Sequence, residues 1–314
     1  MNYSMTIHSL VQESFTRQNT ANMSYEPKVI VFGASGNVGQ YIVPALLRAN
    51  VATTVSTRPG SKATFPDGVK VIKTDLGDSK SLVDAIRGHD VVIALVPARE
   101  ASAQKLLPDA AVAAGAKYFL PSEYGHDATN EEITPYLPIF AEKRAVTAYL
   151  REKEKQGLSW TGITTALFFD WGLPRGMFDM NFKDHTATIW DSGDARFSAA
   201  NMGDIADGVV KLVTDLEARK EYLNQSVYVS SVQVTQNELL AAAEEVTGKK
   251  FKVEHRESGA ALEDPTKVLD VLKAVQFSDR GFCDYARRVE ERHGKFLVNR
   301  QRDVKEVLRE VLGS

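Results

Sequence analysis

The chain has 314 residues, of which 43% are hydrophobic and 25% charged, so it can bury the core of one large domain or of two unequal ones. Its net charge of −3 and the lack of a lysine- and arginine-rich run argue against a nucleic-acid partner, and no apolar run approaches the roughly 18 to 20 residues that span a bilayer. A single cysteine excludes an internal disulfide framework and a cysteine-based zinc site, which favours the cytoplasm. The charge favours a small-molecule partner, and we expect a monomer or homodimer.

Residues 1–26 are polar with scattered apolar side chains, so we expect an N-terminal tail without a secretory signal. Over residues 27–170 short apolar runs alternate with helical segments, which is typical of the βαβ units of a parallel sheet. This pattern predicts an α/β fold, a doubly wound Rossmann sheet with its ligand crevice at the carboxyl ends of the strands. The expected strands are 28–33, 52–57, 69–74, 90–96, 117–121 and 161–168, and the expected helices are 37–50, 79–88, 101–115 and 138–156.

The first strand runs directly into three glycines spaced by three, Gly33, Gly36 and Gly39. Gly33 permits a sharp turn, Gly36 lets the backbone approach a pyrophosphate, and Gly39 lets the following helix pack close to the strand. The free N–H groups of the helix that begins near Asn37 would face the phosphates. A dinucleotide is therefore the first hypothesis, although a tight strand-to-helix turn that binds nothing has the same pattern.

The end of the second strand indicates which dinucleotide fits. An acidic residue at this position accepts hydrogen bonds from the ribose of NAD, but here no acid is present. Arg58 can instead contact two oxygens of a 2′-phosphate, and Lys62 can add a second positive charge, so NADP(H) is favoured over NAD. Asp75, after the third strand, is placed to meet the adenine amino group, but a carboxylate in this region can equally cap the next helix.

One lysine lies on the apolar side of its predicted helix. Ile139, Lys143, Val146 and Leu150 follow the i, i+4, i+7, i+11 spacing of a buried stripe. Burial of an amine lowers its pKa toward the range useful for proton transfer, although a lysine whose head reaches water gives the same pattern. The short-chain dehydrogenase pair, a tyrosine four residues before a lysine, is absent, because Tyr136 precedes Lys143 by seven.

After residue 170 the rhythm changes, so we expect a smaller α+β substrate lobe over residues 171–314, with some segments returning to the Rossmann domain. Its first element is expected to be a hairpin of 187–190 and 195–197 around Asp191-Ser-Gly-Asp194. The further elements expected are a helix at 203–217, a strand at 226–231, a helix at 235–247, a strand at 250–255 and C-terminal helices.

Two other kinds of site are not expected. His126 and Asp127 follow Ser122 closely, but residues so near on one loop rarely form a relay and no G-x-S-x-G elbow exists, which argues against a hydrolase. The six histidines show no metal-ligand spacing, so no metal is implied.

Four segments together resemble the NmrA-like and isoflavone-reductase-like branch of the atypical short-chain dehydrogenases, which includes phenylcoumaran benzylic ether reductases and pinoresinol-lariciresinol reductases. The resemblance covers roughly residues 28 to 260 and is strongest to about 170. The segments are Gly33-Ala-Ser-Gly-Asn-Val-Gly39, Thr57-Arg58-Pro59, Phe119-Leu-Pro-Ser-Glu-Tyr-Gly125 and Phe140-Ala-Glu-Lys143.

The resemblance implies that Lys143 is the catalytic general acid/base and that the segment around Ser122 borders the nicotinamide, with Tyr124 in place of the family's phenylalanine. It implies an NADPH-dependent oxidoreductase of secondary metabolism that transfers a hydride from nicotinamide C4 to a conjugated or aromatic substrate. Two alternatives stay open: a non-catalytic NADP(H)-sensing regulator with a protein partner, and a redox-assisted rearrangement or oxidation. Tyr124, Phe168, Phe169 and Trp171 are expected to wall the substrate pocket, although aromatic side chains of a core strand would read the same way. The residues expected to bind the cofactor are Gly33, Ser35, Gly36, Asn37, Val38, Gly39, Arg58, Lys62, Asp75, Val96, Pro97, Ser122 and Lys143.

Overall fold

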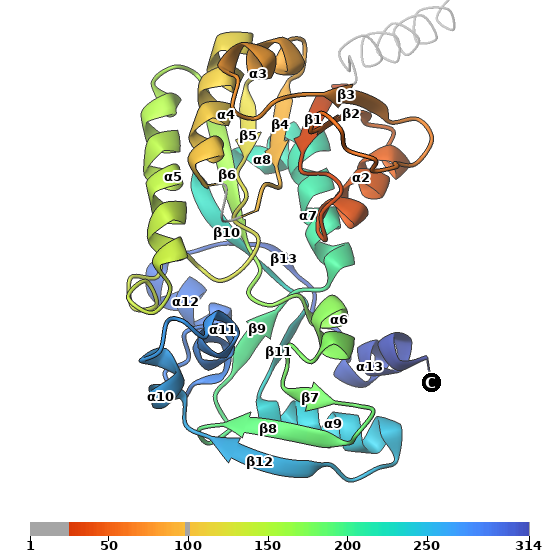
Figure 1. Cartoon of the computed structure of the whole chain (residues 1–314), viewed down its shortest axis with the longest axis vertical. Coiled ribbons are helices and arrows are strands. Elements are labelled where there is room, and N and C mark those ends of the chain that lie inside the picture. The colour runs from red at the N-terminus through yellow and green to blue at the C-terminus, as the bar shows by residue number, and fades with distance from the viewer. Residues whose placement is uncertain (1–24, 98–100, 314) are drawn as a thin grey trace, which may run out of the picture.

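The computed structural model describes residues 25–97 and 101–313, and its upper part is built on an eight-stranded parallel sheet (Figure 1). The strand order is β13-β10-β6-β5-β4-β1-β2-β3, which confirms the predicted doubly wound sheet. Most of the expected tail, residues 1–24, lies outside the described residues. The strands are β1 (Lys28–Phe32), β2 (Ala52–Thr57), β3 (Lys70–Lys73), β4 (Val91–Ala94), β5 (Tyr118–Leu120), β6 (Ser159–Thr164), β10 (Gln225–Ser230) and β13 (Phe296–Asn299).

Helices cover both faces of this sheet, because its central strands are apolar on both sides. In β1, Val29 and Val31 pack in the same core cluster as α2 and α7, whereas Ile30 and Phe32 pack with α3, α4 and α5. Figure 1 shows these two groups of helices on opposite sides of the sheet. The helices are α2 (Gly39–Arg48), α3 (Ser79–Ile86), α4 (Ala101–Ala114), α5 (Pro138–Glu154) and α7 (Met202–Thr214).

The second unit lies below the carboxyl ends of the strands and has a core rich in aromatic side chains. It contains a three-stranded sheet of order β12-β8-β7 and a two-stranded ribbon of β9 and β11. Its elements are α6 (Phe169–Gly172), η2 (Leu173–Arg175), β7 (Met180–Asn181), β8 (Thr186–Trp190), β9 (Phe197–Ala199), β11 (Val232–Val234), α9 (Gln236–Thr247), β12 (Lys252–Arg256), α10 (Ser258–Leu262), α11 (Val268–Phe277), α12 (Tyr285–Arg292) and α13 (Val304–Leu312).

The predicted hairpin around Asp191 is wrong. β8 pairs with β7 and β12, whereas β9 pairs antiparallel with β11. The Asp191 carboxylate accepts hydrogen bonds from the N–H and hydroxyl of Ser258 and from the N–H of Asp279, so the segment between the strands is tied to distant loops. These contacts separate the two strands, because each finds its partner elsewhere in the lobe.

Two other boundaries differ from the prediction for local reasons. The strand predicted to reach residue 168 ends at Thr164, and Ala166 has a φ of 53°, outside the extended region. The helix predicted over 203–217 is two helices, α7 and α8 (Leu216–Lys220), because the Asp215 side chain caps α8 by accepting from the N–H of Ala218.

The chain crosses back into the Rossmann sheet after residue 171. α7 packs beside α2, and β10 and β13 extend the sheet beyond β6. The second unit is thus assembled from stretches on either side of these returning elements, and its core faces the carboxyl ends of the parallel strands.

Candidate active site

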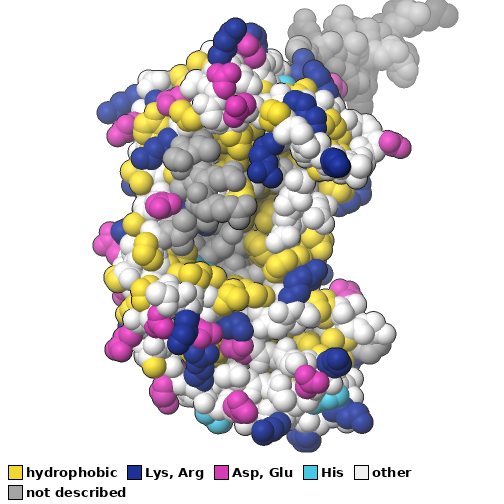
Figure 2. Space-filling model, viewed as in Figure 1, with side chains coloured by type: hydrophobic (Ala, Val, Ile, Leu, Met, Phe, Trp, Pro, Cys, Tyr) yellow, Lys and Arg dark blue, Asp and Glu magenta, His cyan; other side chains and the backbone are white. Residues whose placement is uncertain are grey.

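Three adjoining cavities follow the carboxyl ends of the strands, as expected for a doubly wound sheet. Their volumes are about 180, 360 and 400 Å³. The first and second share Gly36, Val96 and Pro97, and the second and third share Tyr124, Lys143 and Phe168, so the three form one continuous site. In Figure 2, hydrophobic side chains gather around the middle of the visible face, between the two units.

The glycine turn is shaped by backbone contacts that no side chain would tolerate. Gly33 has a φ of 79°, and a Cβ there would lie 2.3 Å from the Leu95 carbonyl oxygen. A Cβ on Gly39 would lie 2.2 Å from the carbonyl oxygen of Ala34. At Gly36, by contrast, only the Gly33 oxygen comes within 4 Å, at 3.3 Å, so a side chain there would project into open space at the cavity.

The N-terminus of α2 points at the second cavity with its N–H groups free of a side-chain cap. Asn37, Val38 and Gly39 line this cavity, and Ser35 lines the first. Free N–H groups at a helix N-terminus, beside a glycine that leaves room, are the donor set that a pyrophosphate requires. The residues present therefore fit a dinucleotide.

The first cavity holds polar groups suited to a phosphorylated ribose. Arg58 and Ser61 line it, and the Lys73 ammonium group fixes the loop between them by donating to the Ser61 carbonyl oxygen at 2.9 Å. The buried hydroxyl of Thr74, which also lines it, has no hydrogen-bond partner among the described residues. Sequence reasoning missed Ser61 and Thr74, whose only signal was their position after strands two and three.

Two residues expected to contact the cofactor are placed differently. Lys62 is exposed and does not line the three cavities. Asp75 also lies outside their walls, and its carboxylate accepts from the N–H of Gly77 at 2.9 Å within the turn before α3. The helix cap in this region is Asp78, which accepts from the N–H of Lys80.

Lys143 lies on α5 where the second and third cavities meet, and only 9% of it is exposed. Its Nζ donates a hydrogen bond of 2.6 Å to the main-chain oxygen of Glu123. Burial lowers the pKa of Lys143, and the negative charge of Glu123 opposes this. The buried stripe is confirmed at Val146 and Leu150, while the side chain of Ile139 lies outside the described residues.

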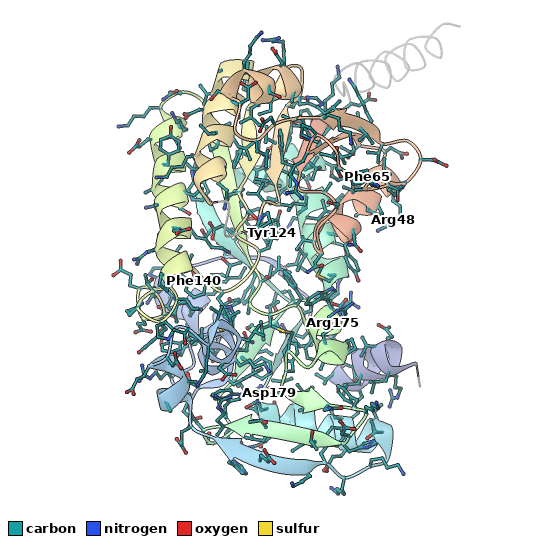
Figure 3. All side chains as sticks on the ribbon, viewed as in Figure 1. Arg48, Phe65, Tyr124, Phe140, Arg175 and Asp179 are labelled. Carbon is teal, nitrogen blue, oxygen red and sulfur yellow. The ribbon has the colours of Figure 1, made fainter. Side chains whose placement is uncertain are left out.

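The residues around Lys143 come from neighbouring strand ends. Ser122 donates a hydrogen bond of 2.8 Å to the main-chain oxygen of Val96, which joins the ends of β4 and β5. Figure 3 shows Tyr124 at the centre of the molecule, between Phe140 on the α5 side and Arg175 on the opposite side. The Tyr124 hydroxyl is buried without a hydrogen-bond partner among the described residues, and burial raises its pKa.

The third cavity is almost entirely apolar. Phe168 and Trp171 line it as expected, and the Arg175 guanidinium stacks 4.4 Å from the centre of the Trp171 ring. Phe169 does not line it: this side chain is fully buried and meets Phe178 edge-on in the lobe core, because the helical turn that brings residues 168 and 171 to the cavity turns residue 169 away. Sequence reasoning missed the remaining wall residues, which are Gly125, His126, Leu137, Phe140, Ala166, Leu167, Met177, Val268 and Leu272.

His126 is a further ionisable side chain of this wall, besides Lys143 and Tyr124. Burial, together with the positive charge of Lys143, lowers the pKa of His126 to about 4, so the ring is neutral at physiological pH. It lies on the loop after β5, three residues from Glu123, and packs near Phe140 with ring centres 6.1 Å apart.

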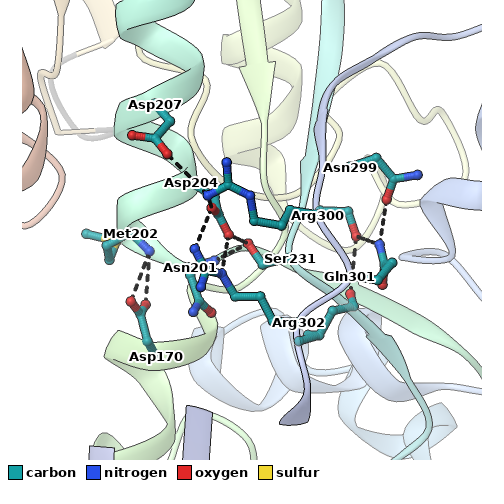
Figure 4. Close-up of polar contacts among 12 residues, drawn as sticks. Asp170, Asn201, Met202, Asp204, Asp207, Ser231, Asn299, Arg300, Gln301 and Arg302 are labelled. Carbon is teal, nitrogen blue, oxygen red and sulfur yellow. Dashed lines mark hydrogen bonds and ion pairs between the residues drawn. The ribbon is translucent and has the colours of Figure 1, made fainter. Parts of the chain in front are cut away.

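A polar network fixes the segment that carries Trp171 (Figure 4). The Asp170 carboxylate accepts from the N–H of Met202 at 3.0 and 3.2 Å, which ties α6 to the start of α7. Two residues after Met202, the fully buried Asp204 accepts two hydrogen bonds from Arg302, one from Arg300 and one from Ser231. Burial would raise the pKa of Asp204, but these bonds outweigh it and hold the pKa below its usual range.

Neither a metal site nor a membrane-spanning helix is found within the described ranges, 25–97 and 101–313. No group of three or more His, Cys, Asp or Glu side chains is arranged to hold a metal ion. No helix combines the length and apolarity needed to cross a bilayer.

Comparison with known proteins places this geometry in a family. The sequence model of the NmrA-like family matches residues 26–296. The chain is 34% identical over 231 residues to the oxidoreductase aprR of Aspergillus flavus (73% of this chain, 76% of that one), and 31% identical over 255 residues to the isoflavone reductase homolog IRL of Zea mays (76% and 80%). Among solved structures, the complex of leucoanthocyanidin reductase with NADPH from Vitis vinifera has a TM-score of 0.75 at 22% identity, covering 91% of this chain and all of that one. These matches confirm the resemblance seen in the motifs: the chain belongs to the NmrA-like family.

Proposed function

We propose that this chain is an NADPH-dependent oxidoreductase that reduces a small aromatic or conjugated substrate. One observation carries the proposal: the buried amine of Lys143 lies where the polar cavity beside the glycine turn meets the apolar third cavity. Relatives named as oxidoreductases and a fold neighbour solved with NADPH support it.

The proposed cofactor would occupy the first two cavities. Arg58 and Ser61 would hold the 2′-phosphate, and the N–H groups of α2 beside Gly36 would hold the pyrophosphate. Val96, Pro97 and Ser122 would border the nicotinamide. NADPH supplies a hydride from C4 of that ring when it is bound.

Lys143 would manage the proton. A substrate seated in the third cavity brings an oxygen next to Nζ, which donates its proton as the neighbouring carbon is reduced. The lowered pKa favours this donation, because a less basic amine releases its proton more readily. Phe168, Trp171 and Phe140 would hold the substrate ring and exclude water.

The third cavity favours an enzyme over a non-catalytic regulator. A sensor needs the cofactor site alone, whereas this chain adds an apolar cavity of about 400 Å³ against the same lysine. A redox-assisted rearrangement would use the same residues and differs in its products.

The test is NADPH consumption, with product identification, against a panel of enones, quinone methides and aryl ethers. Lys143→Met should lower turnover by a factor of about 10² to 10⁴ and leave NADPH affinity unchanged. Lys155→Met, which alters an exposed lysine at the end of the same helix, is the matched control. Arg58→Ala should weaken NADPH binding roughly 10- to 100-fold and NADH binding little. Full turnover in Lys143→Met, or no preference of the wild type for NADPH, would overturn the proposal.

A further inference from the structure

The Glu123 side chain is buried directly behind the candidate active site. Only 4% of the residue is exposed, and its Oε1 has no hydrogen-bond partner among the described residues. The missing side chain of Gly162 on β6 gives it room, since a Cβ there would lie 3.3 Å from Glu123 Cγ and 3.0 Å from the Ser226 hydroxyl. The Oε1 atom of this carboxyl group is thus buried without a donor, which is costly unless a nearby charge compensates it.

The positive charge that acts on the Glu123 carboxyl group is the amine of Lys143. Its Nζ donates to the main-chain oxygen of Glu123 itself, so the two side chains lie against the same turn after β5. In the described part of the chain, no ion pair joins Lys143 to a carboxylate, and the two groups act on each other through space. Burial raises the pKa of Glu123 and lowers that of Lys143, and each charge opposes the effect of burial on the other.

The other ionisable groups on elements packed around Lys143 are neutral, already paired or, like Glu142 and Glu152 of α5, exposed to solvent. His126 is neutral at physiological pH, and Asp127 of the same loop is paired with Arg288 of α12. The remaining pairs, on α4, α5 and α11, are Asp109 with Lys153, Asp179 with Lys273, and Asp270 with Arg256. Among the buried residues near Lys143 that the structure describes, Glu123 is therefore the anion that lacks a partner of its own.

We propose that Glu123 is the counter-ion of Lys143, a positioning residue whose buried carboxylate keeps the amine protonated inside an apolar cavity. The inference rests on the proposed function. When the substrate oxygen is protonated, an N–H bond of Lys143 breaks and an O–H bond forms, which leaves a neutral amine beside the Glu123 carboxylate. The uncompensated negative charge then favours transfer of a proton to Nζ from a hydronium ion or buffer acid of the solvent, which is left as water or as the buffer base, and the ammonium group is restored for the next turnover.

The test measures the protonation of Lys143 without a substrate. The apo protein is treated with acetic anhydride over a range of pH, and acetylation of Lys143, which requires the neutral amine, is quantified by peptide mass spectrometry. Glu123→Gln keeps the side-chain volume and removes the charge, so Lys143 should acetylate on the order of tenfold or more faster at a fixed pH below its pKa. Glu142→Gln, an exposed carboxylate at the adjacent position of α5, should leave the rate unchanged.

Coupling between two sites is reciprocal, which provides a second measurement if Glu123→Gln does not fold. Lys143→Met removes the positive charge and should shift the titration of Glu123 to higher pH, read from the carboxyl ¹³C resonance of glutamate-labelled protein. An unchanged acetylation profile in folded Glu123→Gln, or an unchanged Glu123 titration in Lys143→Met, would overturn the inference.

The pH profile of turnover separates this inference from the proposed function. The reduction requires protonated Lys143, so its rate falls as pH rises through the Lys143 pKa, and in Glu123→Gln this fall should occur at lower pH. Turnover that depends on Lys143 but keeps its pH profile in Glu123→Gln refutes the counter-ion and leaves the oxidoreductase standing. If no member of the substrate panel is turned over, the oxidoreductase is refuted, even where acetylation shows the coupling.

Discussion

The loop that carries Glu123 and His126 is fastened to the lobe by one buried ion pair, and breaking it should destabilise the whole molecule. Asp127 is 1% exposed and Arg288 2% exposed. The Asp127 carboxylate accepts from the Arg288 Nε at 3.1 Å, from the Tyr228 hydroxyl at 2.8 Å and from the N–H of Thr129 at 2.9 Å. The pair therefore links the loop after β5 to β10 and α12.

Arg288→Met leaves the Asp127 carboxylate buried without its cation, a change that costs roughly 3–5 kcal/mol. An unfolding entropy of about 2.1 cal/mol/K per residue gives about 660 cal/mol/K for 314 residues, so Tm should fall by about 5–8 °C. Differential scanning calorimetry measures this, with Arg292→Met, an exposed arginine of the same helix, as control.

The double variant Asp127→Asn/Arg288→Met removes both charges and should recover part of the lost stability, because no unpaired ion remains. If the Tm of Arg288→Met lies within about 1 °C of the Tm of the control, the ion pair does not contribute the stability that its burial implies. A double variant less stable than either single one would refute the reasoning as well, since it would mean that the side chains stabilise through packing and not through charge.

Three further changes have defined outcomes. Tyr124→Phe removes a buried hydroxyl that has no hydrogen-bond partner among the described residues and whose desolvation costs about 1–3 kcal/mol. The Tm should therefore stay equal or rise, and NADPH affinity should not change. A clear fall in Tm would mean that the hydroxyl makes a hydrogen bond. Gly39→Ala places a Cβ 2.2 Å from the Ala34 carbonyl oxygen and should abolish folding or NADPH binding. Gly203→Ala, whose Cβ would have no neighbouring atom of the described residues within 4 Å, should leave the Tm in thermal melts unchanged or raise it, and equal behaviour of the two variants would contradict the close packing at Gly39. The pKa of Asp204 is lowered in the folded protein, so its contribution to stability is complete above the unfolded pKa of about 3.9 and is lost as pH falls through the folded pKa. The urea midpoint of Asp204→Asn should therefore lie below that of the wild type at about pH 7 and approach it at about pH 3. A difference between the two midpoints that does not change with pH would contradict this sign.

The Rossmann half was predictable because its signals are local. Strand β1 is buried on both faces, and its continuous apolar run predicts this burial. The glycines of the following turn are likewise fixed by contacts within a few residues, or with the neighbouring strand end at Leu95. Lys143 was identifiable because helical spacing alone places it on the same face as Val146 and Leu150.

The third cavity was only half predictable, because its walls come from segments that are far apart in the chain. Phe168 and Trp171 follow a strand end and were predicted to line the pocket. Local sequence does not show that Phe169, which lies between them in the chain, points into the core. Val268 and Leu272 line the same cavity from α11, about one hundred residues later in the chain. The apolar spacing of a helix predicts that one face is buried, but it does not predict which cavity that face covers.

This division bears on how the activity is specified. The groups that would hold the cofactor come from strand ends of one sheet, where spacing is set by backbone pairing, and Lys143, which would move the proton, lies on α5 at the edge of the second cavity. The wall that would choose the substrate combines those ends with α6 and α11, whose positions depend on packing in the lobe core and on contacts such as that of Asp170 with Met202. Under the proposed function, substitutions in α11 should therefore change which ring fits the third cavity while the cofactor site and Lys143 stay in place.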